Sequence, residues 1–212
     1  MSTIIDIAEK DPDRPALIFG NGEAQESYGE LELRSRRVAH ALRALGLEEG
    51  DGISVLLNND DEFFDLFWGA LRTGLYFTPI NWHLATAEVA YIVENSDSKV
   101  FIASSQFSKL TGETTADTHP GVRRFSLHGA IDGFSSFNDV LADAPEDAPL
   151  ENQREGATML YSSGTTGFPK GVRSPLTGRD FSDPAGAGLA LGFSSFFGLK
   201  EGDRYLCPAP LY

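Results

Sequence analysis

Segments of strand length and helix length alternate along the middle of the chain, and this alternation limits the possible folds more than any other feature. Short apolar runs at 52–57, 76–80 and 99–104 are predicted to be strands. The stretches at about 61–73 and 86–94 have the apolar spacing of helices. Such a series favours parallel strands joined by crossover helices. We therefore expect an α/β fold with a mostly parallel sheet flanked by helices.

The segments on either side extend this pattern. Residues 15–20 form a predicted strand, followed by the turn signal Asn21-Gly22. Ser27 and Glu30 have the spacing of a capping box, which opens a helix that we expect to end near Leu45. The apolar residues of this helix share one side, and its arginines are predicted to form a solvent-exposed face: Arg34, Arg36, Arg37 and Arg43.

The pattern is weaker between 105 and 156. We expect a strand at 123–127 and a short helix at 136–142. The acidic, proline-containing stretch 143–155 is predicted to be an exposed connector within one domain. In the helix at 61–73, the aromatic residues have helical spacing and are interpreted as core packing rather than a ligand site.

A loop rich in glycine and hydroxyl groups follows the apolar run Met159–Tyr161, and it is the most specific segment of the chain. It combines a Pro169-Lys170 step with small polar residues and glycines: Ser162, Ser163, Gly164, Thr165, Thr166, Gly167 and Gly171. Glycines let backbone N–H groups form an anion-binding concavity, small hydroxyls donate to phosphate oxygens, and a lysine adds positive charge. Composition alone would also fit a surface loop. The order of the residues favours a polyphosphate site.

Two known phosphate loops can be compared with this segment. The P-loop of nucleotide hydrolases places its lysine after a glycine and before a serine or threonine, whereas Lys170 follows Pro169 and precedes Gly171. The stretch from Tyr161 to Val172 instead closely resembles the phosphate loop of the adenylate-forming superfamily, which includes acyl-CoA synthetases and aryl-CoA ligases. The stretches 28–59 and 63–104 are similar to the N-terminal region of acyl-CoA synthetases. The resemblance implies the N-terminal part of the large domain of an adenylate-forming enzyme.

The same resemblance implies roles for individual residues. The loop would wrap the β- and γ-phosphates of ATP, with Lys170 adding charge there and Ser162 lying near Mg²⁺. The expected nucleotide-binding set is Ser162, Ser163, Gly164, Thr165, Thr166, Gly167 and Lys170. Coenzyme A would be the second substrate. No catalytic residue is expected within this chain.

The reaction implied for a complete family member has two steps. A carboxylate attacks the α-phosphorus of Mg-ATP to give an acyl-adenylate and pyrophosphate, and the thiol of coenzyme A then displaces AMP. The family's adenine and ribose motifs and the lysine of its small C-terminal domain lie beyond Tyr212. Residues 1–212 are therefore expected to be an incomplete large domain without the C-terminal lid, and inactive alone. The alternatives are a non-catalytic nucleotide- or phosphate-binding module and a P-loop hydrolase.

Several expectations concern the region after the loop. Residues 174–184 could be a flap or a specificity insertion. Residues 185–199 are uncharged and are interpreted as a buried helix or a wall facing the substrate, and residues 204–207 as a strand. Pro208 to Tyr212 resembles the start of a family motif that borders the acyl pocket. These apolar stretches favour a fatty or aromatic acid as substrate.

Composition excludes some classes of partner. Seventeen basic and thirty-one acidic residues give a net charge of −14, which opposes binding to nucleic acids. Cys207, the one cysteine, cannot form an internal disulfide and is expected to be a small buried residue in a cytoplasmic protein. The N-terminus lacks the apolar core of a signal peptide, and no run is long enough to span a membrane. The four histidines are interpreted as structural and isolated, and a homo-oligomer is possible.

Overall fold

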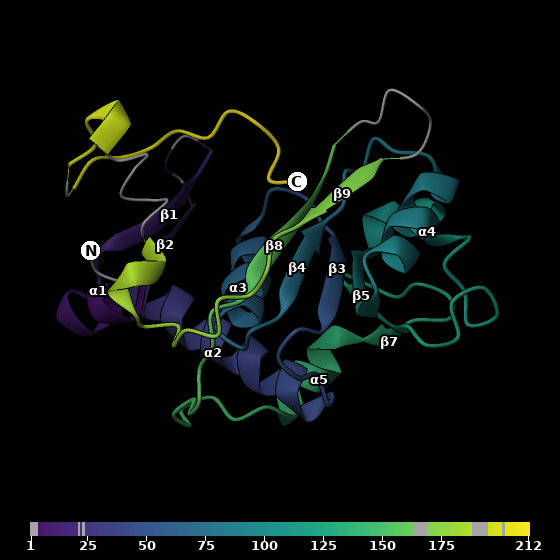
Figure 1. Ribbon diagram of the computed structural model, residues 1–212, viewed down its shortest axis with the longest axis horizontal. Coiled ribbons are helices and arrows are strands. Elements are labelled where there is room, and N and C mark those ends of the chain that lie inside the picture. The colour runs from purple at the N-terminus through teal and green to yellow at the C-terminus, as the bar shows by residue number, and fades with distance from the viewer. Residues whose placement is uncertain (1–3, 21, 23, 163–168, 188–194, 201) are drawn as a thin grey trace.

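The computed structural model describes residues 4–20, 22, 24–162, 169–187, 195–200 and 202–212 (Figure 1). Seven strands form one sheet in the order β7-β6-β5-β3-β4-β8-β9, and β1 and β2 form a separate hairpin. The strands are β1 Pro15–Phe19, β2 Ala24–Ser27, β3 Gly52–Leu56, β4 Tyr76–Pro79, β5 Ser98–Ser104, β6 Arg123–Leu127, β7 Ser135–Ser136, β8 Ala157–Ser162 and β9 Lys170–Arg173. The helices are α1 Ile4–Lys10, α2 Tyr28–Ala44, α3 Asp61–Leu71, α4 Thr86–Asn95 and α5 Phe137–Asp143, with 3₁₀ turns η1 Ser105–Thr111 and η2 Pro184–Ala187.

The sheet is parallel from β7 to β8, and only β9 runs antiparallel to its neighbour. This confirms the mostly parallel α/β fold. The strands and helices expected between 52 and 104 are present, each within one or two residues of the predicted ends. Since the strands are parallel, the loops that follow β3, β4, β5, β6 and β8 all leave from one edge, the carboxyl edge of the sheet.

Helices cover both faces of the sheet (Figure 1). On β5, Val100 and Ile102 pack with α2, α3 and α5, whereas Phe101 and Ala103 pack with α4 on the opposite face. This alternation follows from the two-residue period of a strand, so a strand buried on both faces is mainly apolar. The α3 aromatics Phe63 and Phe67 both pack edge-to-face against Phe77 of β4, as the helical spacing predicted.

The start of α2 shows the predicted capping box. The Ser27 hydroxyl accepts from the Glu30 N–H at 3.2 Å, and the Glu30 carboxylate accepts from the Ser27 N–H at 2.8 Å. The helix ends at Ala44, and Gly46 follows with a φ of 76°. Glycine adopts this left-handed conformation without the steric cost that a side chain would add.

The arginines of α2 do not form a free solvated face, which corrects the prediction from sequence. Arg34 pairs with Glu26, Asp61 and Asp65. Arg43 donates to the carbonyl oxygens of residues 151 and 152 at 2.6 and 2.9 Å, and Arg37 donates to that of residue 141 at 2.8 Å. The connector at 143–155 is accordingly tied to α2 rather than freely exposed, although its acidic side chains at 143, 146 and 147 do face solvent.

The last part of the chain differs from expectation. Cys207 is exposed, not buried, and residues 204–207 form no strand. In the segment 185–199, residues 188–194 lie outside the described residues, and Phe196 and Phe197 are 83% and 63% exposed rather than buried. The two rings pack edge-to-face with each other. No helix in the described residues has the length and apolar character needed to span a membrane.

Candidate functional site

Strand β8 carries the candidate loop to the carboxyl edge of the sheet. It pairs in parallel with β4 through two residue pairs, Tyr76 with Ala157 and Phe77 with Thr158. Gly156 lies so close to β4 that an added Cβ would sit 2.3 Å from the carbonyl oxygen of Leu75. Only a residue without a side chain allows this approach, so Gly156 sets where β8 enters the sheet.

Beyond these pairs β8 turns into a hairpin with β9, and the candidate loop is the connection between them. Ser162 pairs with Lys170 at the loop end of the hairpin, and both are exposed. The other expected phosphate-binding residues lie outside the described residues: Ser163, Gly164, Thr165, Thr166 and Gly167. The structure therefore brings Ser162 and Lys170 together at the base of the loop.

Tyr161 and Gly171 form the next pair of the hairpin and fix its shape. A Cβ on Gly171 would lie 2.8 Å from Cζ of Tyr161 and 2.7 Å from Cε of Met159. The Tyr161 hydroxyl donates to Oδ1 of Asn95, the last residue of α4, at 2.8 Å. Burial, with smaller contributions from Tyr91 and Asp97, raises the pKa of Tyr161 to about 12, so it stays a neutral donor. The hairpin is thus anchored to α4.

Arg173 anchors the other strand of the hairpin. Its guanidinium lies 4.1 Å from the centre of the Tyr76 ring and 3.3 Å from the Asp97 carboxylate, and it donates to the carbonyl oxygen of Gly50. The Tyr76 hydroxyl donates to the carbonyl oxygen of Ser174 at 2.8 Å. A cation over an aromatic ring is favourable, so β9 is held against β4 although it has only one strand neighbour.

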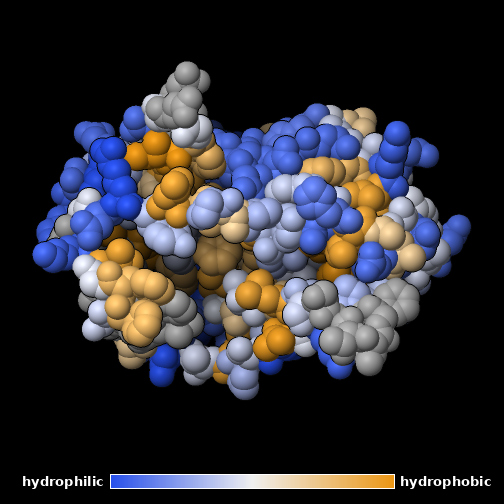
Figure 2. Space-filling view, turned by 90° about the horizontal axis from the view of Figure 1, so that it is seen from above, coloured by the Kyte–Doolittle hydropathy of each residue, from blue (hydrophilic) through white to orange (hydrophobic). Residues whose placement is uncertain are grey.

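A cavity of about 360 Å³ opens beside the hairpin. Its walls come from the end of β4, from α4 and from the hairpin, and they are mainly apolar: Pro79, Leu84, Ile92, Leu160 and Pro169. Ser162 and Tyr212 also line it. Figure 2, which looks onto this edge, shows apolar residues in the hollowed middle of the face. An apolar cavity beside a hydroxyl- and lysine-bearing loop suits a ligand with an apolar part and an anionic part.

The C-terminal residues lie across the same edge. Asn59, in the loop after β3, accepts from the Leu211 N–H at 3.0 Å and donates to the carbonyl oxygen of Ala209 at 3.4 Å. The Tyr212 ring packs edge-on against Trp82, with ring centres 4.6 Å apart. Because α3 and α4 leave β3 and β4 toward opposite faces of the sheet, this position is a topological switch point, where α/β proteins commonly bind ligands.

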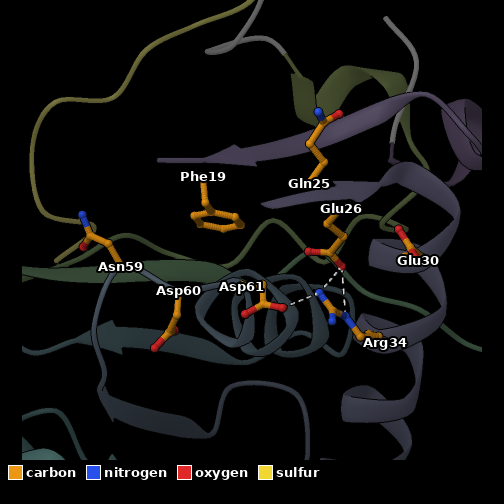
Figure 3. Close-up of a pocket in the computed structure, with 8 residues that line it drawn as sticks. All are labelled: Phe19, Gln25, Glu26, Glu30, Arg34, Asn59, Asp60 and Asp61. Atoms are coloured by element: carbon orange, nitrogen blue, oxygen red, sulfur yellow. Dashed lines mark hydrogen bonds and ion pairs between the residues drawn. The ribbon is translucent and has the colours of Figure 1, made fainter. Parts of the chain in front are cut away.

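A second cavity, of about 300 Å³, lies between the β1–β2 hairpin and the start of α3 (Figure 3). Arg34 there contacts three carboxylates, and Glu26 is only 3% exposed. Burial outweighs the Arg34 charge and raises the pKa of Asp65 to about 8; burial also raises the pKa of Glu26. This cluster was not predicted from the sequence. Its one signal was Asp65, an acid between Phe64 and Leu66 on an apolar helix.

The histidines were all interpreted as isolated, and for His128 that was wrong. His128 Nε2 lies 3.2 Å from Glu62 Oε1. The other three differ: His119 is buried with Nε2 3.2 Å from the Ala90 carbonyl oxygen, His40 contacts the Ala148 carbonyl oxygen, and His83 is exposed beside Trp82.

A sequence profile described as "AMP-binding enzyme" matches residues 5–212. The chain belongs to the AMP-binding enzyme family. The sequence is 37% identical over 160 residues to 4-coumarate–CoA ligase 3 of Oryza sativa subsp. japonica, covering 75% of this chain and 28% of that protein. It is 29% identical over 201 residues to a long-chain-fatty-acid–CoA ligase of Mycobacterium tuberculosis, covering 95% of this chain and 38% of that protein. The chain thus spans about a third of the length of these curated relatives.

Solved structures agree with the assignment to the AMP-binding enzymes. An o-succinylbenzoate coenzyme A synthetase from Bacillus subtilis in complex with AMP matches with a TM-score of 0.72 and 26% identity, over 100% of this chain and 50% of that chain. An inhibitor-bound N-terminal domain from Mycobacterium tuberculosis matches with a TM-score of 0.68 and 30% identity, over 81% of this chain and 44% of that chain. The fold is that of the N-terminal domain of adenylate-forming enzymes, and this membership excludes a P-loop hydrolase.

Proposed function

We propose that this chain is the nucleotide-binding part of an ATP-dependent acid–CoA ligase. Its complete form would activate a carboxylic acid as an acyl-adenylate and transfer the acyl group to coenzyme A. The observation that carries the proposal is the position of the candidate loop, which joins β8 to β9 at the carboxyl edge of the parallel sheet. Phosphoryl transfer depends mainly on positioned reactants and fixed positive charge around the phosphates.

The residues of the loop would bind the departing pyrophosphate rather than react. Lys170 is exposed at the loop end of the hairpin. Its ammonium group would reach the oxygens of phosphates bound by the loop. The hydroxyls and backbone N–H groups of Ser162, Ser163, Gly164, Thr165, Thr166 and Gly167 would surround those oxygens. Tyr161 and Gly171 would keep the two strands in register, so that Ser162 and Lys170 stay paired where the loop begins and ends.

Magnesium would accompany the nucleotide. The Ser162 hydroxyl is a hard oxygen ligand of the kind that Mg²⁺ accepts, and Mg²⁺ bound with ATP takes much of its coordination from phosphates and water. Because a serine side chain carries a single hydroxyl oxygen, Ser162 would contribute one ligand to the ion.

The cavity beside the hairpin favours an apolar acid. Leu84, Ile92 and Leu160 contribute apolar walls, and Glu88, the charged residue in this lining, has its carboxylate oxygen 2.9 Å from the Ala85 N–H that begins α4. A carboxylate that caps a helix is a poor candidate for binding a substrate ammonium, so an amino acid fits this cavity less well than a fatty or aromatic acid. We propose a fatty or aromatic carboxylate as substrate.

Nucleotide binding by this chain tests the first half of the proposal. We expect Mg-ATP to bind, and Lys170→Ala to weaken binding, while Lys109→Ala, another exposed lysine on η1, should leave it unchanged. Binding can be measured by isothermal titration calorimetry. Equal affinity in wild type and Lys170→Ala would contradict the role assigned to Lys170.

Acid-dependent ATP–pyrophosphate exchange tests the second half. A panel of fatty and aromatic acids would be assayed with this chain and with a longer product that carries the rest of the family's length. We expect exchange only in the longer product, with Lys170→Ala lowering it by on the order of a hundredfold, the usual effect of losing one charge-stabilising donor. Nucleotide binding without exchange in either form would favour a non-catalytic nucleotide-binding module.

A further inference from the structure

Three metal-ligating side chains meet at the carboxyl edge on the other side of β3 from the hairpin. Asp60 and Glu62 lie at the start of α3, and His128 follows β6 directly. One ligand atom from each lies within 4.8 Å of the other two. The residues come from segments more than sixty positions apart in the sequence, so the fold, and not a local turn, brings them together.

The imidazole of His128 is held by its surroundings with one nitrogen facing Glu62. Nδ1 lies 3.1 Å from the hydroxyl of buried Ser104, and Nε2 lies 3.2 Å from Glu62 Oε1. In the neutral ring that donates through Nδ1, Nε2 is an acceptor. Two acceptors at this distance repel each other unless a proton or a cation lies between them. A histidine oriented by its second nitrogen is the usual arrangement of a metal-binding histidine.

A proton on Nε2 of His128 would give Glu62 a hydrogen-bond donor, but it would leave one oxygen of Asp60 without a donor. Its Oδ1 is buried and accepts no hydrogen bond within the described part of the chain. Figure 3 shows the Asp60 carboxylate directed away from Arg34, whereas Asp61 is joined to that arginine. Arg34 therefore does not neutralise Asp60. A buried acceptor without a partner destabilises a protein, and a cation among these three groups would supply the missing partner.

We propose that Asp60, Glu62 and His128 bind one divalent transition-metal ion, with Zn²⁺ as the best match. One imidazole nitrogen and two carboxylate oxygens are donors that Zn²⁺ accepts, and an imidazole ligand disfavours Ca²⁺ and Mg²⁺, which prefer oxygen. Two carboxylates balance the charge of the ion. Bound metal would join the loop after β6 to the start of α3, next to Asn59, which holds residues 209–211.

This site is separate from the proposed nucleotide site. In the sheet order, β4 lies between β3 and β8, and β6 lies further away on the opposite side of β3. Neighbouring strands are about 4.8 Å apart, so β8 lies roughly 10 Å from β3, which leads to Asp60 and Glu62, and roughly 19 Å from β6, which leads to His128. A metal bound by Asp60, Glu62 and His128 would therefore act on the arrangement of the loops and would not contact phosphates held by Lys170.

Titration of the untagged chain with Co²⁺, and competition with Zn²⁺, tests the proposal. We expect one ion per chain, with a visible absorption spectrum that Zn²⁺ abolishes. Asp60→Asn and His128→Asn should lose this binding; asparagine is used because His128 has a φ of 61°, which asparagine tolerates. Ser104→Ala removes the hydroxyl at Nδ1 and should weaken binding by about 10- to 100-fold.

His83→Asn is the matched control, because His83 is exposed and belongs to no metal-spaced group among the described residues. The affinity of His83→Asn for Co²⁺ should equal that of wild type. Absence of Co²⁺ and Zn²⁺ binding by wild-type protein would overturn the proposal. Equal loss in His83→Asn and His128→Asn, or displacement of Co²⁺ by a similar concentration of Mg²⁺, would also overturn it. Circular dichroism of each variant separates loss of ligand from loss of fold.

Discussion

Replacing Arg72 by alanine should be among the most destabilising single changes in this chain. Arg72 ends α3 and is only 1% exposed. Its guanidinium donates to Glu32 Oε1 at 3.0 Å, to the Ser35 hydroxyl at 3.1 Å and to Gln153 Oε1 at 2.8 Å. It therefore joins α2, α3 and the segment that leads into β8. The substitution leaves the partly buried carboxylate and the amide oxygen without their donor.

The expected loss of stability in Arg72→Ala follows from these contacts. Removing one partner of a buried ion pair costs about 3–5 kcal/mol. Arg36, 3.5 Å from the second oxygen of Glu32, keeps that carboxylate partly paired, but Ser35 and Gln153 also lose their hydrogen bonds to Arg72, so we expect a loss within this range. A domain of this length loses about 2–4 °C in Tm for each kcal/mol, so the midpoint should fall by roughly 6–20 °C. Since the total stability of a domain is about 5–15 kcal/mol, a substantial fraction of the chain could be unfolded at 37 °C.

Urea unfolding, followed by tryptophan fluorescence and circular dichroism, measures the loss. Arg37→Ala is the matched control, because Arg37 makes one exposed ion pair with Glu146 and one hydrogen bond to the carbonyl oxygen of Leu141, which together contribute about 1–2 kcal/mol. The double variant Glu32→Leu/Arg72→Met should recover much of the stability, since apolar groups of similar volume replace the pair without an orphan charge. If Arg72→Ala costs no more than Arg37→Ala, the reasoning from burial and hydrogen bonding is refuted.

Two further changes test the hairpin and the acidic cavity. Gly171→Ala should lower the free energy of unfolding by about 1–3 kcal/mol and weaken nucleotide binding, because the added methyl group collides with Met159 and Tyr161. Gly121→Ala is the control: an added Cβ there meets nothing within 4 Å, so the urea assay should show no change in stability. Asp65, whose pKa burial raises to about 8, holds a proton that the unfolded chain loses near pH 4. Unfolding between about pH 5 and pH 7 then releases that proton, so rising pH lowers wild-type stability by about 1.4 kcal/mol per pH unit from this group. Asp65→Asn should remove this contribution. If the free energy of unfolding changes between about pH 5 and pH 7 by the same amount in Asp65→Asn as in wild type, the assigned pKa is contradicted.

The parts of the fold that sequence predicted well are those set by local pattern. The strands between 52 and 104 are mainly apolar because both of their faces are buried, and the Ser27–Glu30 box marks a helix start by its own hydrogen bonds. The antiparallel return of β9 could not be read in the same way. Residues 170–173 are exposed and have no apolar period, and their pairing depends on Tyr161 and Arg173 contacts across the hairpin.

Functional residues were predicted only where they are contiguous in the sequence. The loop was found because its residues are contiguous, whereas Asp60, Glu62 and His128 are brought together only by the order of β3 and β6 in the sheet. Arg37 and Arg43 of α2 were misassigned because they donate to backbone carbonyls more than a hundred residues away. Long-range pairing of this kind leaves no periodic signal in a single sequence.

The two residue pairs that join β8 to β4 have a consequence for how the chain is made. Residue 158 is synthesised 81 positions after its partner, residue 77. At about 5–20 residues per second, the β8 side of β4 stays unpaired for roughly 4–16 seconds on the ribosome. During that interval the strand offers open backbone groups beside the aromatic side chains Tyr76 and Phe77. The nascent protein is therefore most exposed to mispairing just before its candidate loop emerges, and a chaperone that shields strand edges would act in that interval.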